Sequence, residues 1–285
     1  MSDGAGTWRL LSDDRQDGSC NMAVDEAILE GYETAPSPPP PTLRLYGWRP
    51  AALSLGKSQR AAGAHVPAAL TAEAVDLVRR PTGGEAVLHE HERTYAVIGA
   101  AGTPPFEGGP VDVYRQIARA LVSALRRLGL EATSAEPPPG PRAKPGAICF
   151  ERTGAWEITV GGRKILGSSQ FRKRRAFLQH GSLPWRLDGA RLAALTGVRV
   201  DPTHFTDLES AMGRPVSEDE IDAAFVSAFE ETFGIRLVKG ALTESEALRA
   251  AELRCWKYDS MAWTLDAKLG DREQHWGPAL GLVGS

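Results

Sequence analysis

The sequence predicts an α/β protein of the α+β type, with a mixed, largely antiparallel sheet flanked by helices. Short segments of alternating apolar and polar residues, separated by glycine and proline turns, are typical of strands and recur along the chain. One stretch, 111–128, keeps apolar residues at helical spacing over about five turns. The regular strand–helix alternation of a doubly wound parallel sheet is absent. We therefore expect antiparallel pairing to dominate.

The length and composition are those of one large domain. The 285 residues are enough to bury a substantial apolar core, and we expect a single domain over 1–285 with a short helical segment from about residue 243. The 33 basic and 36 acidic residues give a formal charge of −3, so no strong positive field would attract nucleic acid. The sequence therefore indicates no nucleic-acid partner.

Nothing in the sequence indicates a membrane or an oxidising compartment. No apolar stretch approaches the roughly 18 residues of a membrane-spanning helix, and the first residues lack the basic and apolar regions of a signal peptide. Cys20, Cys149 and Cys255 are odd in number and far apart, which fits neither a disulfide framework nor a zinc site. We expect free thiols, a cytoplasmic location and no membrane partner.

The first predicted helix covers 21–30, where Val24, Ala27 and Ile28 form a narrow apolar stripe. Gly31 is expected to end it. The run of prolines that follows cannot continue a helix and predicts an exposed, extended loop.

Strands are predicted after this loop. The segments with strand character are 43–48, 52–56, 75–80, 86–89 and 94–99. The turn 81–84, Pro-Thr-Gly-Gly, separates the third from the fourth. The helix at 111–128 is followed by Gly129, in the position of a C-cap.

In the second half of the chain, a proline-rich loop leads to Cys149. The Gly161-Gly162 pair predicts a hairpin between 156–160 and 163–167, and 176–183 predicts another strand. Two later helices are predicted from capping-box pairs, which are Ser217 with Glu220 and Thr243 with Glu246.

Cys149 and Lys164 are candidates for covalent chemistry. Cys149 follows a loop, where reactive groups concentrate, although a free cysteine is more often a buried core residue. Lys164 lies just beyond the hairpin turn, which would bring it back toward Cys149. An ammonium near a thiol lowers the pKa of the thiol, and a desolvated lysine can act as an acid or a base. The alternative is a solvated surface lysine.

The segment 79–89, RRPTGGEAVLH, is a candidate ligand-binding turn. Its two glycines let backbone N–H groups approach a ligand, and Arg79 or Arg80 could fix an anionic group. The alternative is a tight bend between strands.

Two further motifs are expected to be structural. The His-Glu-His triplet at 89–91 alternates as metal ligands on a strand would, but no third ligand completes a site, so we expect no metal. The basic run 172–175 is expected to be a solvated face, with docking of an acidic protein as the alternative.

Together these segments resemble the lipoate-protein ligase A and octanoyltransferase superfamily, whose fold is the biotin/lipoate ligase-like α/β domain. The chain is most similar to the cysteine-dependent octanoyl-acyl-carrier-protein:protein N-octanoyltransferases. The resemblance runs in order over most of the chain, through 21–27, 43–59, 79–89, Thr94-Tyr95, Cys149-Phe150, 161–170, 178–183, Leu253, Tyr258 and Trp263.

The resemblance implies transfer of an octanoyl group from octanoyl-acyl carrier protein to a lipoyl-domain lysine through a thioester on Cys149. Lys164 would act as an acid or base, or support the oxyanion. The acceptors would be the lipoyl domains of 2-oxoacid dehydrogenases or the glycine cleavage H protein. Because a thioester is already activated, neither ATP nor another cofactor is expected. The residues implied to shape the acyl pocket are Arg80, Gly83, Gly84, His89, Gly167 and Ser168.

Three alternatives remain open. An ATP-dependent lipoate-protein ligase would form an acyl-adenylate and need no nucleophilic cysteine, so Cys149 favours a transferase. An amidotransferase that moves octanoyl between lipoyl proteins would also use a cysteine. A non-catalytic acyl or lipoyl-domain binding protein would keep the pocket without turnover.

Two positions depart from the family pattern. Glu85 stands where the transferases commonly have a basic residue and the ligases a third glycine, and a carboxylate pointing inward there would disfavour phosphate binding. Lys57 stands where relatives often have an aromatic residue, next to the expected mouth of the pocket.

Overall fold

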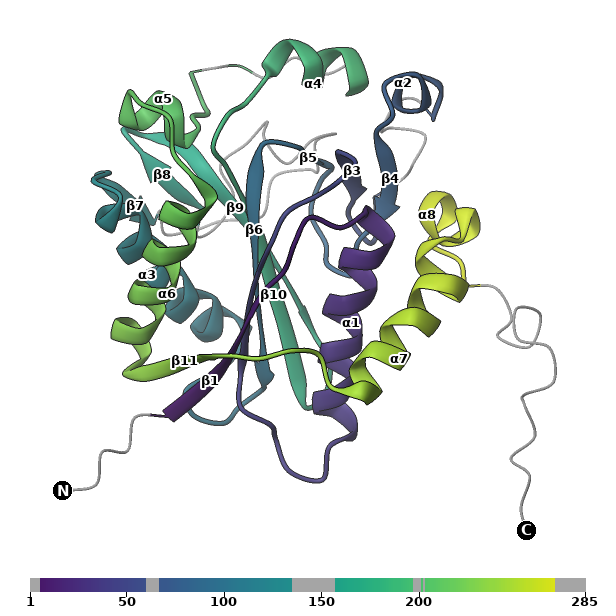
Figure 1. The fold of residues 1–285 in the computed structure, drawn as a ribbon, viewed down its shortest axis with the longest axis vertical. Coiled ribbons are helices and arrows are strands. Elements are labelled where there is room, and N and C mark those ends of the chain that lie inside the picture. Colours follow the sequence, from purple (N-terminus) through teal and green to yellow (C-terminus); the bar gives the residue numbers. More distant parts are fainter. Residues whose placement is uncertain (1–5, 60–66, 135–156, 197–200, 202, 270–285) are drawn as a thin grey trace.

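The structure is a computed structural model that describes residues 6–59, 67–134, 157–196, 201 and 203–269. It shows helices on both faces of a central sheet (Figure 1). The strands are β1 (Gly6–Ser12), β2 (Thr42–Tyr46), β3 (Ala52–Leu55), β4 (Asp76–Arg79), β5 (Val87–His89), β6 (Glu92–Ala100), β7 (Ala132–Ser134), β8 (Ile158–Val160), β9 (Arg163–Arg172), β10 (Ala176–Pro184) and β11 (Ile235–Lys239). The helices are α1 (Gly18–Thr34), α2 (Pro67–Ala72), α3 (Pro110–Arg127), α4 (Gly189–Thr196), α5 (Leu208–Met212), α6 (Glu218–Phe233), α7 (Glu244–Leu253), the π-helix η2 (Arg254–Tyr258) and α8 (Met261–Asp266).

In the described part of the chain, the large sheet has eight strands in the order β11-β1-β2-β6-β10-β9-β8-β7. β1 is parallel to both β11 and β2, and the other neighbouring strands are antiparallel. The predicted mixed, largely antiparallel sheet is therefore confirmed. A smaller sheet has the order β4-β3-β5.

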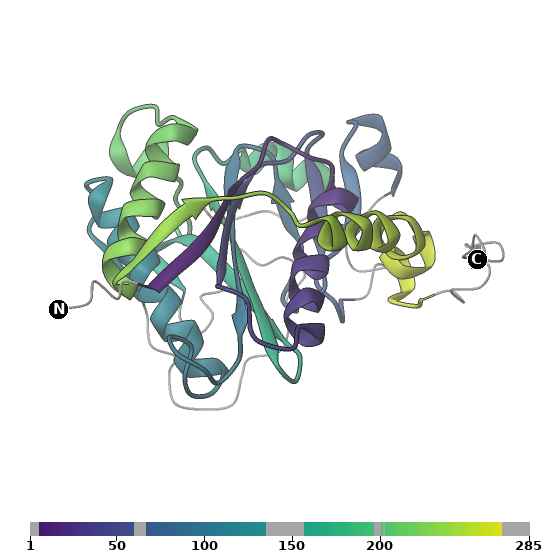
Figure 2. The same cartoon turned by 60° about the horizontal axis from the view of Figure 1, so that its bottom comes forward.

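Alternation along the central strands assigns each side chain to one of two helical layers (Figure 2). On β2, Leu43 and Leu45 pack in the core beneath α3 and α6. Arg44 and Tyr46 point to the opposite face, where Arg44 hydrogen-bonds to Asn21 of α1. Because both faces are covered, every residue of β2, β6 and β10 is buried. Polar residues on the α1 face must therefore find partners inside the protein.

α1 is longer than the helix predicted at 21–30. It begins at Gly18, where the Asp17 side chain caps the Cys20 N–H at 2.8 Å, and it continues through Gly31 to Thr34. The prediction that Gly31 ends the helix was wrong. Glycine disfavours a helix interior by only about 1 kcal/mol, and the buried Tyr32, whose hydroxyl donates to the Pro40 carbonyl at 2.6 Å, anchors the last turn.

The other predicted turns and helix ends are present, but one predicted capping box is incomplete. Ser217 accepts from the Glu220 N–H at the start of α6, whereas the Glu220 carboxylate binds Arg214. Gly161 and Gly162 have φ of +57° and +76° and join β8 to β9, which is the backbone conformation that a two-residue hairpin requires. Thr243 and Glu246 form the predicted capping box of α7. None of the described helices is both long and apolar enough to cross a membrane.

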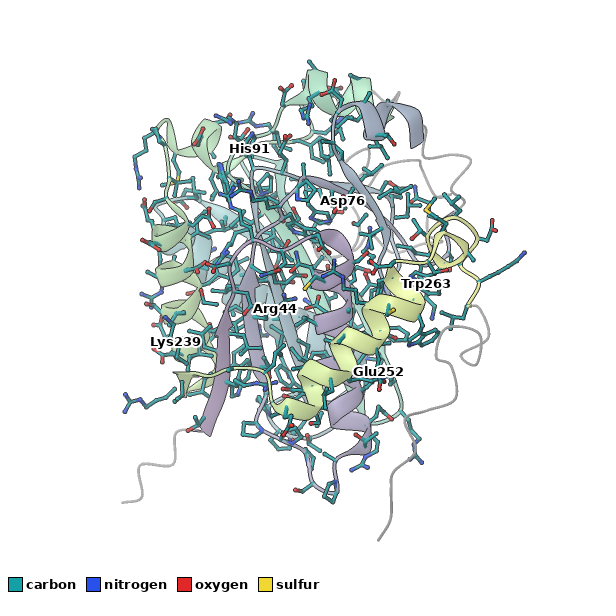
Figure 3. All side chains as sticks on the ribbon, turned by 45° about the vertical axis from the view of Figure 1, so that its right-hand side comes forward. Arg44, Asp76, His91, Lys239, Glu252 and Trp263 are labelled. Atoms are coloured by element: carbon teal, nitrogen blue, oxygen red, sulfur yellow. The ribbon has the colours of Figure 1, made fainter. Side chains whose placement is uncertain are left out.

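The C-terminal segment α7–η2–α8 packs against α1 and β4. Lys257 donates to both carboxylate oxygens of the buried Glu26 of α1, at 2.8 and 2.6 Å. Trp263, labelled in Figure 3, donates its indole N–H to the Arg79 carbonyl at 2.9 Å. The segment is thus attached to the layer of α1 and to the end of β4 by buried polar contacts.

Candidate functional site

A cavity lies between α1, the strands β9 and β10, and the small sheet. It contains about 500 Å³ of empty space, counting the open solvent at its mouth. Gly83 adjoins it, because its carbonyl accepts hydrogen bonds from Arg80 and Ser169. The cavity is lined by five of the six residues expected to shape a pocket, Arg80, Gly84, His89, Gly167 and Ser168.

The residues that line the cavity differ in exposure. Gly84 is exposed and Gly167–Ser169 are partly exposed, so the cavity reaches the surface between the 81–84 turn and β9, which we call its mouth. Met22, Tyr46 and Trp48 are buried lining residues.

Many of the lining residues were not predicted from the sequence. His180, Gly181 and Ser182 belong to the segment LQHGSL, and Thr94 belongs to a predicted strand, so the resemblance contained them without giving them a role. The alternation of side chains along a strand could have identified Thr94, His180 and Ser182, because the even-numbered residues of β6 and β10 face α1. The missed lining residues are Met22, Tyr46, Trp48, Ser54, Val87, Thr94, Ser169, His180, Gly181 and Ser182.

Of the proposed catalytic pair, only Lys164 has a described position, because Cys149 lies outside the described residues. Lys164 is 1% exposed and forms an ion pair with the buried Glu157. Its backbone is held by the 203–206 segment, where its N–H donates to the His204 carbonyl at 2.8 Å. The interpretation of Lys164 as a solvated surface lysine is therefore excluded. It precedes the lining residue Gly167 on the same strand.

The other two cysteines are poor candidates for a nucleophile. Burial, with the nearby Asp17, raises the pKa of the half-buried Cys20, which keeps the thiol protonated. Cys255 is exposed on η2 in the C-terminal segment. Neither residue lines the cavity.

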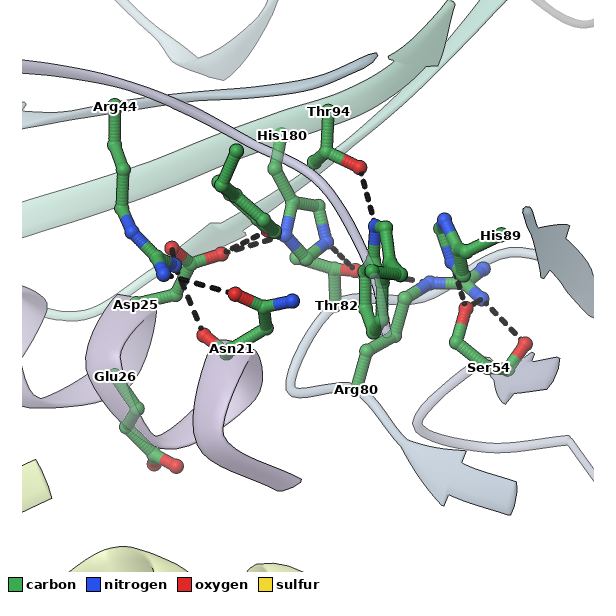
Figure 4. A network of polar contacts seen from close by, with 12 residues as sticks. Asn21, Asp25, Glu26, Arg44, Ser54, Arg80, Thr82, His89, Thr94 and His180 are labelled. Atoms are coloured by element: carbon green, nitrogen blue, oxygen red, sulfur yellow. Dashed lines mark hydrogen bonds and ion pairs between the residues drawn. The ribbon is translucent and has the colours of Figure 1, made fainter. Parts of the chain in front are cut away.

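Asp25 of α1 is a buried acid that binds three partners beside the cavity (Figure 4). Arg44 donates to Oδ1 at 2.8 Å, Tyr46 donates its hydroxyl to Oδ2 at 2.9 Å, and Nδ1 of His180 lies 3.0 Å from Oδ2. Burial alone would raise the pKa of Asp25, but the His180 hydrogen bond and the charge of Arg44 outweigh it and lower the pKa. Asp25 is therefore an ionised carboxylate.

The network continues from His180 to the 81–84 turn. Nε2 of His180 lies 2.7 Å from the Thr82 hydroxyl, which accepts a hydrogen bond from Nε of Arg80 at 3.2 Å. Arg80 also donates to the carbonyl and hydroxyl oxygens of Ser54, each at 3.0 Å. Figure 4 shows this chain of polar contacts from α1 to β3.

His89 occupies the far side of the network. Its ring stacks on Trp48 at a centroid distance of 4.0 Å, and its Nε2 lies 2.8 Å from the Ser54 hydroxyl. Burial lowers the pKa of His89, although Glu92 near its Nδ1 acts in the opposite direction. The neutral ring therefore presents a flat surface to the cavity rather than a positive charge.

The guanidinium groups of Arg79 and Arg80 are both engaged with protein oxygens. Arg80 donates to the carbonyls of Gly83 and Glu85, both at 2.7 Å, in addition to its contacts with Ser54 and Thr82. Arg79 donates to backbone carbonyls, which are those of Gly56, Lys57, Gln59, Trp263, Thr264 and Leu265. These contacts shape the turn and attach the C-terminal segment, and they do not direct either charge at an anionic ligand.

The two departures from the family pattern have defined positions. Glu85 is half-buried and is not among the described residues that line the cavity. Lys57 is exposed, and its ammonium lies 4.6 Å from the centre of the Phe171 ring of β9. This cation–π contact attaches the segment after β3 to the strand that forms the mouth.

The His-Glu-His triplet is divided among separate partners. His89 contacts Ser54 and Trp48, Glu90 accepts from Arg191, and His91 lies 2.8 Å from Arg186. Among the described residues, no group of three or more histidine, cysteine, aspartate or glutamate side chains is arranged to hold a metal ion.

The basic run 172–175 is not simply a solvated face. Lys173 donates to Glu30 of α1 at 3.0 Å, and the Arg175 N–H donates to Glu33 of the same helix. The prediction was wrong for these two residues, because the β9–β10 turn folds back onto the acidic end of α1. Arg174 is exposed, as predicted.

Comparison with known proteins agrees with this geometry. Residues 17–230 match the family model of the lipoyl protein ligase A/B catalytic domain. The octanoyltransferase LipM of Kyrpidia tusciae is 39% identical over 271 residues, covering 90% of this chain and 98% of the relative. That of Moorella thermoacetica is 38% identical over 270 residues, covering 91% and 98%. A crystal structure of lipoate-protein ligase A bound with ATP matches with a TM-score of 0.76 at 25% identity, covering 91% of this chain and 98% of that one.

Proposed function

Because this chain belongs to the lipoyl protein ligase A/B catalytic domain family, we propose that it transfers an octanoyl group to the lysine of a lipoyl domain in protein lipoylation. The names of its octanoyltransferase relatives support this reaction. The observation that carries it is the cavity, which has the buried apolar side chains of Met22 and Trp48 in its wall and reaches the surface beside β9, the strand that bears Lys164. A linear acyl chain fits such a space with its carbonyl at the mouth.

The proposed reaction has two half-reactions through Cys149. The thiolate attacks the thioester carbonyl of octanoyl-acyl carrier protein, the bond from the carbonyl carbon to the Cys149 sulfur forms as the bond to the carrier sulfur breaks, and the carrier thiolate leaves and takes up a proton from Lys164 or from solvent. The amine of the acceptor lysine then attacks the acyl-enzyme, the amide forms, and the Cys149 sulfur leaves. The acceptors are the lipoyl domains of 2-oxoacid dehydrogenases or the glycine cleavage H protein. A reactive thiol needs a reducing compartment, in agreement with the cytoplasmic location expected from the sequence.

Lys164 is proposed to assist both steps by moving a proton or by stabilising the oxyanion. Its burial and its ion pair with Glu157 support this role, because a desolvated cation acts strongly on nearby developing charge. Neither half-reaction requires ATP, since the thioester supplies the activated acyl group.

The contacts of Arg79 and Arg80 favour a transferase over an ATP-dependent ligase. A ligase must hold the phosphates of ATP, and arginine is well suited to that task. Here both guanidinium groups are directed at backbone carbonyls and neutral hydroxyls of the protein. This arrangement leaves Arg80 shaping the cavity wall and Arg79 holding the C-terminal segment.

The test is intact-protein mass spectrometry after mixing the enzyme with octanoyl-acyl carrier protein. We expect one added octanoyl group on the wild type and on the Cys20→Ser and Cys255→Ser controls, and none on Cys149→Ala. Acylation of a lipoyl domain by Cys149→Ala at the wild-type rate would overturn the thioester mechanism.

Three further measurements separate the alternatives. Pyrophosphate release with lipoate and ATP would identify a ligase. Octanoyl transfer from an octanoylated H protein but not from the acyl carrier protein would identify an amidotransferase. Tight acyl binding without any turnover would identify a binding protein.

A further inference from the structure

Thr82 of the 81–84 turn and His180 of β10 are far apart in the sequence and joined in the structure. The Thr82 hydroxyl lies 2.7 Å from Nε2 of His180, and both groups are buried (Figure 4). The other ring nitrogen of His180, Nδ1, lies 3.0 Å from Oδ2 of Asp25. His180 of β10 therefore connects α1 to the 81–84 turn.

The direction of each hydrogen bond in this chain follows from its ends. Asp25 is an ionised carboxylate and can only accept, so Nδ1 of His180 carries the hydrogen. At the other end Arg80 can only donate, so its Nε–H bonds to the Thr82 oxygen. The Thr82 hydroxyl also lies 2.7 Å from Nε2 of His180. With the ring in the Nδ1–H tautomer, Nε2 accepts the Thr82 hydroxyl hydrogen and every group in this chain has a partner.

These contacts argue against His180 as a base that acts on substrate. Although the ring lines the cavity, both of its nitrogens are occupied by protein groups. A base needs a free nitrogen within hydrogen-bond reach of the proton that it removes.

The side chain that His180 binds belongs to the turn at the mouth of the cavity. The Thr82 carbonyl accepts from the Lys57 N–H at 2.8 Å, and the Gly83 carbonyl accepts from the Ser169 hydroxyl at 3.0 Å. These bonds attach the turn to its neighbours through the backbone. The His180–Thr82 bond attaches it to the large sheet through a side chain, beside the exposed lining residue Gly84.

We propose that His180, held by Asp25 in the Nδ1–H tautomer, is a positioning residue that fixes the 81–84 turn through Thr82 for acyl transfer. The role of the turn in catalysis rests on the proposed function, whereas the tautomer and the hydrogen bond do not. A turn displaced by about 1 Å is enough to slow a reaction roughly 100-fold.

The activity test uses substitutions that keep one of the two His180 contacts. His180→Asn retains a donor near the position of Nδ1 and loses the Thr82 contact. His180→Gln retains an acceptor near the position of Nε2. Thr82→Val removes the hydroxyl at nearly constant volume, and Thr82→Ser keeps it. The exposed Thr232, changed to Val, is the matched control.

We expect Thr82→Val and His180→Asn each to lower the rate constant of enzyme acylation by about 100-fold, with KM for octanoyl-acyl carrier protein unchanged. The double variant should be no slower than either single one, because both remove the same bond. Thr82→Ser should restore the rate, and His180→Gln should exceed His180→Asn. A wild-type rate for Thr82→Val, with His180→Asn inactive, would overturn the proposal and assign His180 a direct role on substrate.

The second test is independent of activity. Nitrogen-15 NMR of histidine-labelled wild-type protein should show His180 as the Nδ1–H tautomer, with the Nε2 signal shifted in Thr82→Val. An Nε2–H tautomer would contradict the proposal whether or not the enzyme transfers octanoyl groups. Failure of the Cys149 labelling test would overturn the proposed function and leave this result standing.

Discussion

Arg79 and Arg80 are adjacent at the end of β4, and their guanidinium groups bind different parts of the molecule. Arg80 donates to the 81–84 turn and to Ser54 at the cavity, whereas Arg79 donates to the last turn of α8. The adjacent acidic residues Asp25 and Glu26 of α1 also bind different parts of the molecule. Asp25 faces His180, and Glu26 points away from that network to Lys257 (Figure 4). In each of these two adjacent pairs, one residue contacts the network beside the cavity and the other contacts the C-terminal segment.

Arg79→Lys should destabilise the protein by about 3 kcal/mol. A lysine ammonium cannot donate to the carbonyls of 56–59 and to those of α8 at the same time, so several buried carbonyls would lose their hydrogen-bond donor. Urea denaturation measures the loss, and hydrogen exchange should show faster exchange of the amides in α8 than in α3. The control is Arg236→Lys, which changes an exposed side chain. Equal stability of both variants would show that the Arg79 contacts contribute little.

Lys164→Arg should fold normally and lose activity. Arginine keeps the positive charge and the pairing with Glu157, but it does not give up a proton near neutral pH. If Lys164 transfers a proton, the acylation rate should fall by at least about 100-fold, measured by single-turnover mass spectrometry. Circular dichroism and thermal unfolding should match the wild type. Full activity in Lys164→Arg would mean that only the charge matters.

The ion pair of Asp25 should contribute stability that disappears in acid. The pKa of Asp25 is lower in the folded protein than its ordinary value of 3.8, so the unfolded chain binds this proton more readily. The stabilisation is complete above pH 3.8 and is lost as the pH falls from there through the folded pKa. Asp25→Asn should cost about 3 kcal/mol at pH 7, because it leaves Arg44 without this partner.

The measurement is chemical denaturation of wild type and Asp25→Asn from pH 7 down to pH 3. The difference in unfolding free energy between them should narrow only below pH 4. A constant difference over the whole range would show that Asp25 is neutral in the folded protein.

Gly181→Ala should distort the cavity wall. A Cβ at this position would lie 2.5 Å from the Gly167 carbonyl oxygen and 2.7 Å from the Tyr95 ring, so β9 or Tyr95 must move. We expect a loss of about 2 kcal/mol in stability and weaker binding of an octanoyl ligand, measured by calorimetry. Gly189→Ala is the control, because no atom lies within 4 Å of its added Cβ. Unchanged binding would place the acyl chain away from Gly181.

The local sequence pattern correctly predicted those strands and turns whose conformation depends mainly on their own residues. The alternation in 43–48 is enough to assign a strand, since each side chain faces one of two buried layers. The Gly161-Gly162 pair is enough to assign a hairpin, because few other residues adopt its dihedral angles. The β1–β11 pair was not predicted. It joins Gly6 to Ile235, and a parallel pairing over that separation leaves no local signal.

The site was predicted less completely than the fold. Resemblance identified Arg80, Gly84 and His89 on the cavity wall, but the role of His180 depends on Asp25 and Thr82, which come from two other elements. Nothing in the neighbourhood of Asp25 distinguishes a buried acid from one on the solvent face of a helix. Only the position of α1 on the sheet makes that distinction.

The contacts of Arg79 also bear on how the protein is made. Three of the carbonyls that it binds belong to Trp263, Thr264 and Leu265, which leave the ribosome long after β4. Until then the guanidinium lacks half of its partners, and β1 lacks its β11 neighbour. A nascent chain stalled before residue 263 should therefore hold the layer of α1 loosely and remain sensitive to protease near β4. The attachment of β4 to the C-terminal segment is a late product of translation.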